Sequence, residues 1–132
     1  MEHKQHYQVL VVEDEPSLQE AIKIKLEKVG LEPLVFDNGQ LALDAITGRG
    51  TQFDGIWLDF DIFGMNGLEF MQRFVTMPDW QKCPVVIVSN TGNPELINKA
   101  IKLGAKEWII KAEVRLDDTV NRFIELIDSA KA

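Results

Sequence analysis

The stretch FDGIWLDFDIFGMNG, residues 53–67, decides the fold of this chain. Its apolar run Ile56–Leu58 is typical of a short strand that is buried on both faces, and the run ends at Asp59. Turn-forming residues follow, and a helical pattern begins at Leu68. An acid at the carboxyl end of a buried strand stands where open α/β sheets bind ligands. Because an Asp can also serve only to cap a turn, the other strand ends must be compared with it.

The composition predicts a single globular domain. The chain has 132 residues, of which 45% are hydrophobic and 27% charged, and a chain of this length can bury a sizeable core. The net charge of −7 argues against nucleic-acid binding, which needs clustered Lys and Arg. No apolar run is long enough to span a membrane, no signal peptide is recognisable, and the lone Cys83 cannot form an internal disulfide. We therefore expect a cytoplasmic domain without a membrane partner.

Residues 1–8 are polar and are expected to form a flexible tail, with the domain running from residue 9 to residue 130. His3 and His6 lie in this tail. A histidine pair at this spacing can bind a metal weakly, but a solvated tail is the expectation.

Five apolar runs alternate with five amphipathic patterns along the rest of the chain. The expected strands are 9–12, 34–36, 56–58, 85–88 and 108–110. Residues that commonly begin or end helices flank the amphipathic patterns: Pro16, Gly30, Asp37 or Asn38, Asn66, Asn93 and Gly104. This alternation predicts an α/β fold, a parallel sheet with helices on both faces, and right-handed crossovers restrict it to a doubly wound sheet.

Polar residues stand at the carboxyl ends of four expected strands. If the strand order is 2-1-3-4-5, the first and third strands flank the switch point, and Glu13, Asp14 and Asp59 share one crevice. Two unit charges at ~4 Å repel by ~4 kcal/mol at an effective dielectric near 20. The cluster is therefore expected to bind a cation, and its carboxylate oxygens are ligands that suit Mg²⁺. Lys111 adds a fixed positive charge, and Ser89 with the backbone N–H groups after it completes a pocket for three oxygens. These features predict a phosphoryl acceptor site with Asp59 as the nucleophile.

The chain resembles the receiver domain of two-component response regulators, chemotaxis regulators among them, from residue 9 to residue 130. Four segments carry the resemblance: VVEDEP at 11–16, LDFDIFGMNG at 58–67, PVVIVSNTG at 84–92 and GAKEWIIK at 104–111. It implies a flavodoxin-like fold with five strands and five helices, and a cytoplasmic phosphorelay protein. It also implies a histidine kinase or histidine phosphotransfer protein as phosphoryl donor, an output protein or domain as the recipient of the signal, and no enzymatic turnover beyond the domain's own phosphorylation and dephosphorylation.

The same resemblance implies roles for individual residues. Mg²⁺ would be held by Glu13, Asp14, Asp59 and the backbone carbonyl of Asp61, with Glu13 acting through water. The phosphoryl group would be bound by Ser89, Asn90 and Lys111, and the switch residues would be Ser89 and Trp108.

The chain departs from the family pattern at four positions. Phe63 stands where proline is frequent, and Trp108 is bulkier than the usual tyrosine or phenylalanine. Asn90 replaces a small residue and is expected to narrow access to Asp59. Ala112 replaces a proline whose peptide bond is commonly cis; because a cis bond before alanine costs ~3–4 kcal/mol, we expect the bond after Lys111 to be trans.

Two alternatives stay open on the sequence. Asp59-Phe60-Asp61 matches the D-x-D core of haloacid-dehalogenase-type phosphatases, although Phe63 does not fit that motif and the acids of the first strand would lack a role. The other alternative is a pseudo-receiver, a binding module with the same fold that is not phosphorylated. Asn90 and Ala112 are the residues that favour it.

Overall fold

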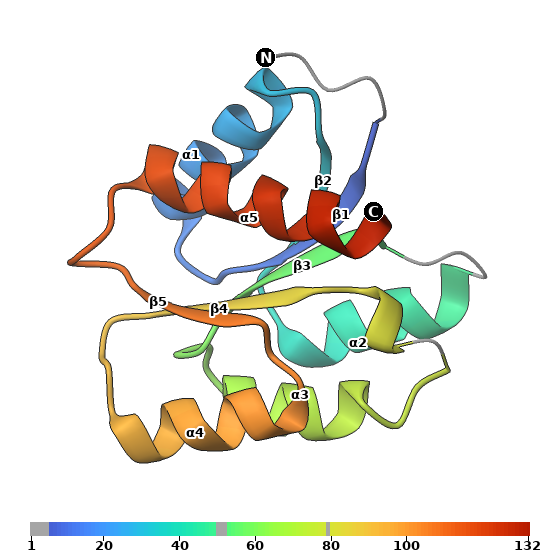
Figure 1. Ribbon diagram of the computed structural model, residues 1–132, viewed down its shortest axis with the longest axis vertical. Helices are drawn as coiled ribbons and strands as arrows, with labels where there is room; N and C mark the ends of the chain where they lie inside the picture. Colours follow the sequence, from blue (N-terminus) through green and yellow to red (C-terminus); the bar gives the residue numbers. More distant parts are fainter. Residues whose placement is uncertain (1–5, 50–52, 79) are drawn as a thin grey trace.

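Five parallel strands form one sheet in the order β2-β1-β3-β4-β5, as predicted (Figure 1). The structure is a computed structural model that describes residues 6–49, 53–78 and 80–132. The strands are β1 Gln8–Val12, β2 Glu32–Phe36, β3 Gly55–Asp59, β4 Val85–Ser89 and β5 Glu107–Ile110. Every residue of β3 and β4 is buried, as expected for strands whose apolar runs Ile56–Leu58 and Val85–Val88 are covered on both faces.

The described residues form five α-helices and one short 3-10 helix, η1. The α-helices are α1 Pro16–Lys28, α2 Gly39–Arg49, α3 Gly67–Phe74, α4 Pro94–Leu103 and α5 Leu116–Lys131, and η1 spans Trp80–Lys82. Helices α1 and α5 cover one face of the sheet, and α2, α3 and α4 cover the other (Figure 1). The fold is therefore the predicted flavodoxin-like, doubly wound arrangement. None of these helices combines the length and the apolar character needed to cross a membrane.

Local signals in the sequence explain where the helices begin and end. The Asn66 side chain accepts a hydrogen bond from the Glu69 N–H at 3.0 Å, and the Glu69 carboxylate accepts one from the Asn66 N–H at 3.4 Å, forming the expected capping box. Asn93 caps α4, and Asn38 accepts a hydrogen bond from the N–H of Leu41 at the start of α2. Gly104 ends α4 with a φ of +116°, a conformation that glycine adopts without a side-chain clash.

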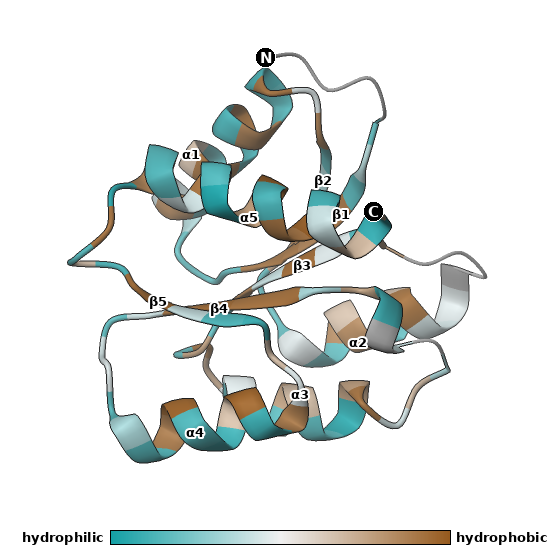
Figure 2. Ribbon diagram, viewed as in Figure 1, coloured by the Kyte–Doolittle hydropathy of each residue, from teal (hydrophilic) through white to brown (hydrophobic). Residues whose placement is uncertain are grey.

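Each face of the sheet carries its own hydrophobic layer. The layer under α2, α3 and α4 includes Leu58, Phe70 and Met71, and the layer under α1 and α5 includes Trp57 and Phe123. The hydropathy colours of Figure 2 show β4 as an apolar ribbon between helices that carry polar residues outward. The alternation of Trp57 and Leu58 between the two layers follows from the period of two in a strand.

The expected tail is wrong for Tyr7 and Gln8. Gln8 is the first residue of β1 and pairs with Glu32 of β2. The ring of Tyr7 is buried, and its O–H donates to Asp128 Oδ1 of α5 at 2.7 Å. His6 is exposed, and His3 lies outside the described residues. The two residues join the domain because partners distant in the chain bind them.

Strand β2 begins at Glu32, two residues before the predicted start at Leu34. The early start includes Pro33, a residue that lowers the expectation of a strand because it donates no N–H. It is accommodated here because β2 is an edge strand of the sheet.

Candidate functional site

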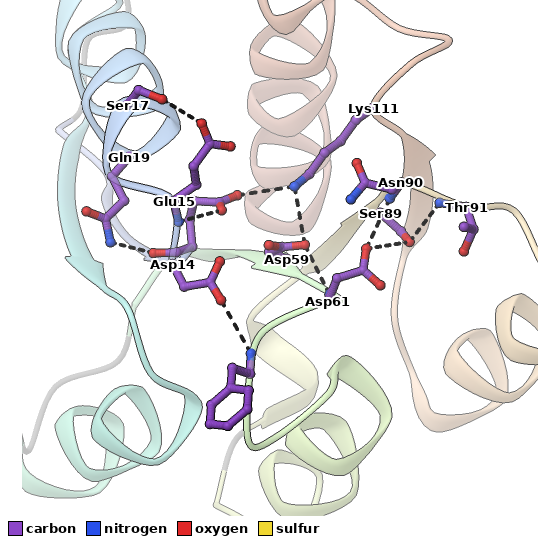
Figure 3. Close-up of polar contacts among 12 residues, drawn as sticks. Asp14, Glu15, Ser17, Gln19, Asp59, Asp61, Ser89, Asn90, Thr91 and Lys111 are labelled. Atoms are coloured by element: carbon purple, nitrogen blue, oxygen red, sulfur yellow. Dashed lines mark hydrogen bonds and ion pairs between the residues drawn. The ribbon is translucent and has the colours of Figure 1, made fainter.

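Three carboxylates meet at the carboxyl edge of the sheet, as predicted. Asp59 is the last residue of β3, and Glu13 and Asp14 directly follow β1. One oxygen from each of the three lies within 4.8 Å of the others. Figure 3 shows Asp14 and Asp59 at this edge. Asp59 and Glu13 are only 2% and 1% exposed, whereas Asp14 faces solvent.

The pairing of β1 with β3 brings these acids together. Val12 lies opposite Leu58 in the parallel register, so the next residue of each strand lies at the same level. On the other side of β1, the Glu13 N–H extends the pairing with β2 by donating to the Phe36 carbonyl at 2.9 Å. The closeness of Glu13 to Asp59 therefore follows from the register of the two strands and from the residue at which each strand ends.

Lys111, which directly follows β5, reaches both buried acids. Its Nζ lies 3.4 Å from Glu13 Oε1 and 3.4 Å from Asp59 Oδ1. No cis peptide bond occurs in the described part of the chain, so the bond between Lys111 and Ala112 is trans, as predicted. The long side chain compensates for the absent proline, because its four methylenes give the ammonium latitude.

Burial makes the negative charge of this cluster costly. Desolvation, followed by the nearby Asp59 carboxylate, raises the pKa of Glu13 from 4.5 to about 7. Desolvation also raises the pKa of Asp59, although the N–H of Asp61 and the ammonium of Lys111 oppose the shift. Burial lowers the pKa of Lys111, but the carboxylates of Asp59 and Glu13 outweigh it and leave that pKa raised. The site therefore holds a surplus of buried negative charge.

A second group of hydrogen bonds joins β3 to β4. The fully buried Ser89, the last residue of β4, donates its O–H to Asp61 Oδ2 at 3.2 Å, and the Asn90 N–H donates to the same oxygen at 3.1 Å. The Asp61 N–H donates to Asp59 Oδ1 at 3.1 Å. Figure 3 shows Asp61 between Asp59 and the Ser89–Asn90 segment. The sequence placed Asp61 near the metal ligands, but it did not reveal this contact of its carboxylate.

Backbone groups of the loops also hold the acids, and sequence reasoning missed them. The Glu15 N–H donates to Glu13 Oε2 at 3.1 Å, and the Phe63 N–H donates to Asp14 Oδ2 at 3.4 Å. The ring of Phe63 is 92% exposed. No residue type signals such contacts, because any residue except proline can supply the N–H.

Trp108 connects β5 to the loop after β4. Its ring centroid lies 4.9 Å from that of Phe60, and its Nε1–H donates to the Thr91 carbonyl at 2.9 Å. The Thr91 N–H in turn donates to Ser89 Oγ at 3.1 Å. The predicted switch aromatic is therefore two hydrogen bonds away from the predicted phosphoryl-binding hydroxyl.

The donor set fits a divalent cation. Glu13, Asp14 and Asp59 offer hard carboxylate oxygens close together, the ligand type that Mg²⁺ prefers. The raised pKa values of Glu13 and Asp59 show that nearby protein groups do not fully balance these charges. A bound Mg²⁺ would supply the missing positive charge.

A family model of the response regulator receiver domain matches residues 9–122. The chain belongs to this family. As a receiver domain it is a phosphoacceptor signalling domain of two-component systems, and the match favours neither the phosphatase nor the pseudo-receiver alternative.

Curated relatives of this receiver domain come from several signalling systems. The transcriptional regulatory protein FixJ of Bradyrhizobium diazoefficiens is 26% identical over 89% of this chain and 54% of its own length. The chemotaxis protein CheV1 of Helicobacter pylori is 26% identical over 89% of this chain and 38% of its own length. A protein-glutamate methylesterase/protein-glutamine glutaminase of Desulfotalea psychrophila is 31% identical over 80% of this chain and 29% of its own length. The chain thus spans from about a fifth to about half of the length of the curated relatives it matches.

Solved structures support the fold of this receiver domain. A CheY-like receiver domain protein from Methanospirillum hungatei superposes with a TM-score of 0.86 at 20% identity, covering 96% of this chain and 98% of that one. A receiver domain protein from Clostridium thermocellum gives a TM-score of 0.83 at 23% identity, covering 95% of this chain and 97% of that one. At these identities the likeness concerns the fold alone.

Proposed function

We propose that this receiver domain accepts a phosphoryl group on Asp59 from a histidine kinase or a histidine phosphotransfer protein. The observation that carries the proposal is the position of the buried Asp59 carboxylate, 3.4 Å from the ammonium of Lys111 and within 4.8 Å of Glu13 and Asp14 oxygens. A carboxylate nucleophile beside a fixed cation and a cation site is the arrangement that phosphoryl transfer needs, because positioning and charge neutralisation supply most of the catalysis.

In the proposed transfer, an Asp59 oxygen forms a bond to phosphorus while the bond to the donor's leaving group breaks and its electron pair departs with that group. Lys111 remains protonated and faces the growing negative charge. Glu13, Asp14, Asp59 and the Asp61 carbonyl would hold Mg²⁺, which when bound would neutralise charge on the transferring group. The Ser89 O–H and the Asn90 N–H would receive phosphoryl oxygens.

The signal would leave the site through Ser89 and Trp108. Movement of the Ser89 hydroxyl toward a phosphoryl oxygen would break its link to Thr91, whose carbonyl now accepts the Trp108 Nε1–H. Repacking of Trp108 would then change the surface near α4, β5 and α5 that an output protein or domain recognises. This is a population shift driven by a local charge, and we place it in the cytoplasm.

Labelling with acetyl phosphate in the presence of Mg²⁺ tests the proposal. Intact-protein mass spectrometry should detect one phosphoryl group per chain, and Asp59→Asn should abolish it. Asp44→Asn, which removes an exposed carboxylate of α2, is the control and should label normally. Labelling that persists in Asp59→Asn would move the acceptor elsewhere, and repeated turnover of a phosphomonoester would favour the phosphatase alternative.

A further inference from the structure

The donors that would receive the phosphoryl oxygens already have an anionic acceptor. Oxygen Oδ2 of Asp61 accepts the O–H of Ser89 at 3.2 Å and the N–H of Asn90 at 3.1 Å. We call these two donors the phosphoryl-oxygen seat. Because the Thr91 N–H donates to Ser89 Oγ, the oxygen of that hydroxyl already has a donor, and its single proton is directed to Asp61.

We propose that the Asp61 carboxylate is a built-in occupant of the phosphoryl-oxygen seat and must leave it before a phosphoryl group on Asp59 can be bound there. The inference rests on the proposed function, in which Asp59 is the acceptor. One hydroxyl proton and one amide proton cannot serve two anions fully. The carboxylate of Asp61 and the incoming phosphoryl group therefore compete for the same two hydrogen bonds.

The Asp61 side chain is free to move out of the phosphoryl-oxygen seat into solvent. The residue is exposed, so a rotation of its side chain can carry the carboxylate into solvent while its N–H stays on Asp59 Oδ1. By contrast, Ser89 is fully buried at the end of β4, and the Thr91 N–H also holds its hydroxyl oxygen. The mobile member of the contact is thus the acid, and its displacement opens the seat.

Competition for the seat should slow phosphorylation. During transfer from acetyl phosphate, the bond from Asp59 oxygen to phosphorus forms, the bond from phosphorus to the acetate oxygen breaks, and acetate leaves with the electron pair. Asp61 is neither modified nor consumed. Its carboxylate only withholds two donors from the transferring group and adds like charge beside it.

The rate of labelling by acetyl phosphate with Mg²⁺ tests this inference in four proteins. Asp61→Ala empties the seat, whereas Asp61→Asn keeps an acceptor oxygen but loses the charge. Asp44→Asn removes one exposed negative charge of α2 and serves as the matched control beside the wild type. Because hydrogen bonds to charged groups are worth roughly tenfold or more in an equilibrium, Asp61→Ala should label about tenfold faster than Asp44→Asn, with Asp61→Asn between them.

Proton chemical shifts give a readout that does not depend on labelling. Without Mg²⁺ or a phosphoryl donor, the Asn90 amide proton of the wild type should resonate downfield, because it is bound to a carboxylate. Asp61→Ala should move it upfield, and Asp44→Asn should leave it in place. An Asn90 resonance that is unaffected by Asp61→Ala would show that the seat is not occupied in solution and would overturn the inference.

The outcomes separate the two proposals. If the wild type labels on Asp59 but both Asp61 variants label no faster than Asp44→Asn, the inference is wrong and the proposed function stands. If none of the four proteins labels, the proposed function is wrong and the inference falls with it. A faster Asp61→Ala together with a shifted Asn90 resonance supports both.

Discussion

An aspartate pairs with a lysine at each end of strand β3, but the two pairs differ in burial. Asp54 immediately precedes the strand and pairs with Lys131 of α5, and Asp59 ends the strand and pairs with Lys111. At the first end the Asp54 oxygens accept the Gln8 N–H at 2.9 Å and lie 2.6 Å from Lys131 Nζ. Both side chains of this ion pair are partly exposed.

At the other end one ammonium serves two buried carboxylates. Lys111 lies 3.4 Å from each of Asp59 and Glu13, and the pKa values of both acids are raised. The partly exposed pair at Asp54 joins β3 to α5, whereas the two buried carboxylates that share Lys111 leave negative charge available for a ligand. An Asp–Lys contact therefore indicates a structural or a functional role only when burial and the number of charges are considered together.

Removal of each lysine should show the largest difference between the ends. Lys111→Met leaves two buried carboxylates without a cation and should lower the free energy of unfolding by about 3 kcal/mol. Lys131→Met removes one member of a partly exposed pair and should cost less than about 1 kcal/mol. Urea denaturation without Mg²⁺ measures both, and equal losses would contradict the contrast.

The stability of the domain should fall as pH rises through the acid range when Mg²⁺ is absent. The pKa of Glu13 is about 7 in the fold against an ordinary 4.5, so between these values the folded state binds more protons than the unfolded state, and its relative stability decreases with pH. The decrease that Glu13 contributes should amount to about 3 kcal/mol, and the raised pKa of Asp59 acts in the same direction.

The control for this pH dependence is Glu13→Gln, which removes the titrating group. Urea denaturation of both proteins at about pH 5 and about pH 7.5 in the presence of a chelator compares them. The variant should show a flatter profile. A wild-type stability that rises over this interval would contradict the assignment of buried, uncompensated charge.

Mg²⁺ should stabilise the acidic end of β3 and leave the other end unaffected. A ligand that binds only the folded state at a hundred times its Kd adds about 2.7 kcal/mol. Thermal melts with and without Mg²⁺ should therefore differ by several degrees in the wild type and in Asp54→Asn, but much less in Asp14→Asn. A midpoint that does not change in the wild type at millimolar Mg²⁺ would argue against a cation site.

Neutral isosteres at the two aspartates should change stability in opposite directions. Asp59→Asn removes a buried charge that the fold disfavours and should stabilise the protein by about 1 kcal/mol without Mg²⁺. Asp54→Asn weakens the contacts to the Gln8 N–H and Lys131 and should destabilise it by about 1 kcal/mol. Denaturation curves of the two variants, measured side by side, give the sign of each change in the free energy of unfolding. A change of the same sign in both variants would contradict the contrast between the two ends of β3.

Much of the acidic end could be predicted because its causes are local. Ile56–Leu58 and Val85–Val88 are apolar runs with clear ends, so the polar residues that follow them, Asp59 and Ser89, had to lie at one edge of a parallel sheet. The start of β1 could not be predicted in the same way. Tyr7 and Gln8 have no strand pattern of their own and are held by partners in α5 and β2.

The sequence by itself determined which segments form strands, the asparagine caps of α3 and α4, and the polar residues Asp59 and Ser89 that end β3 and β4, because these depend on neighbours within a few positions. Only the tertiary structure decided that Tyr7 would bind Asp128, 121 residues away, and that Asp61 would take the Ser89 hydroxyl, 28 residues away. Such contacts depend on the path of a loop and on the rotamer of one side chain. Both are set by the packing of the whole domain, and neither leaves a periodic trace in the sequence.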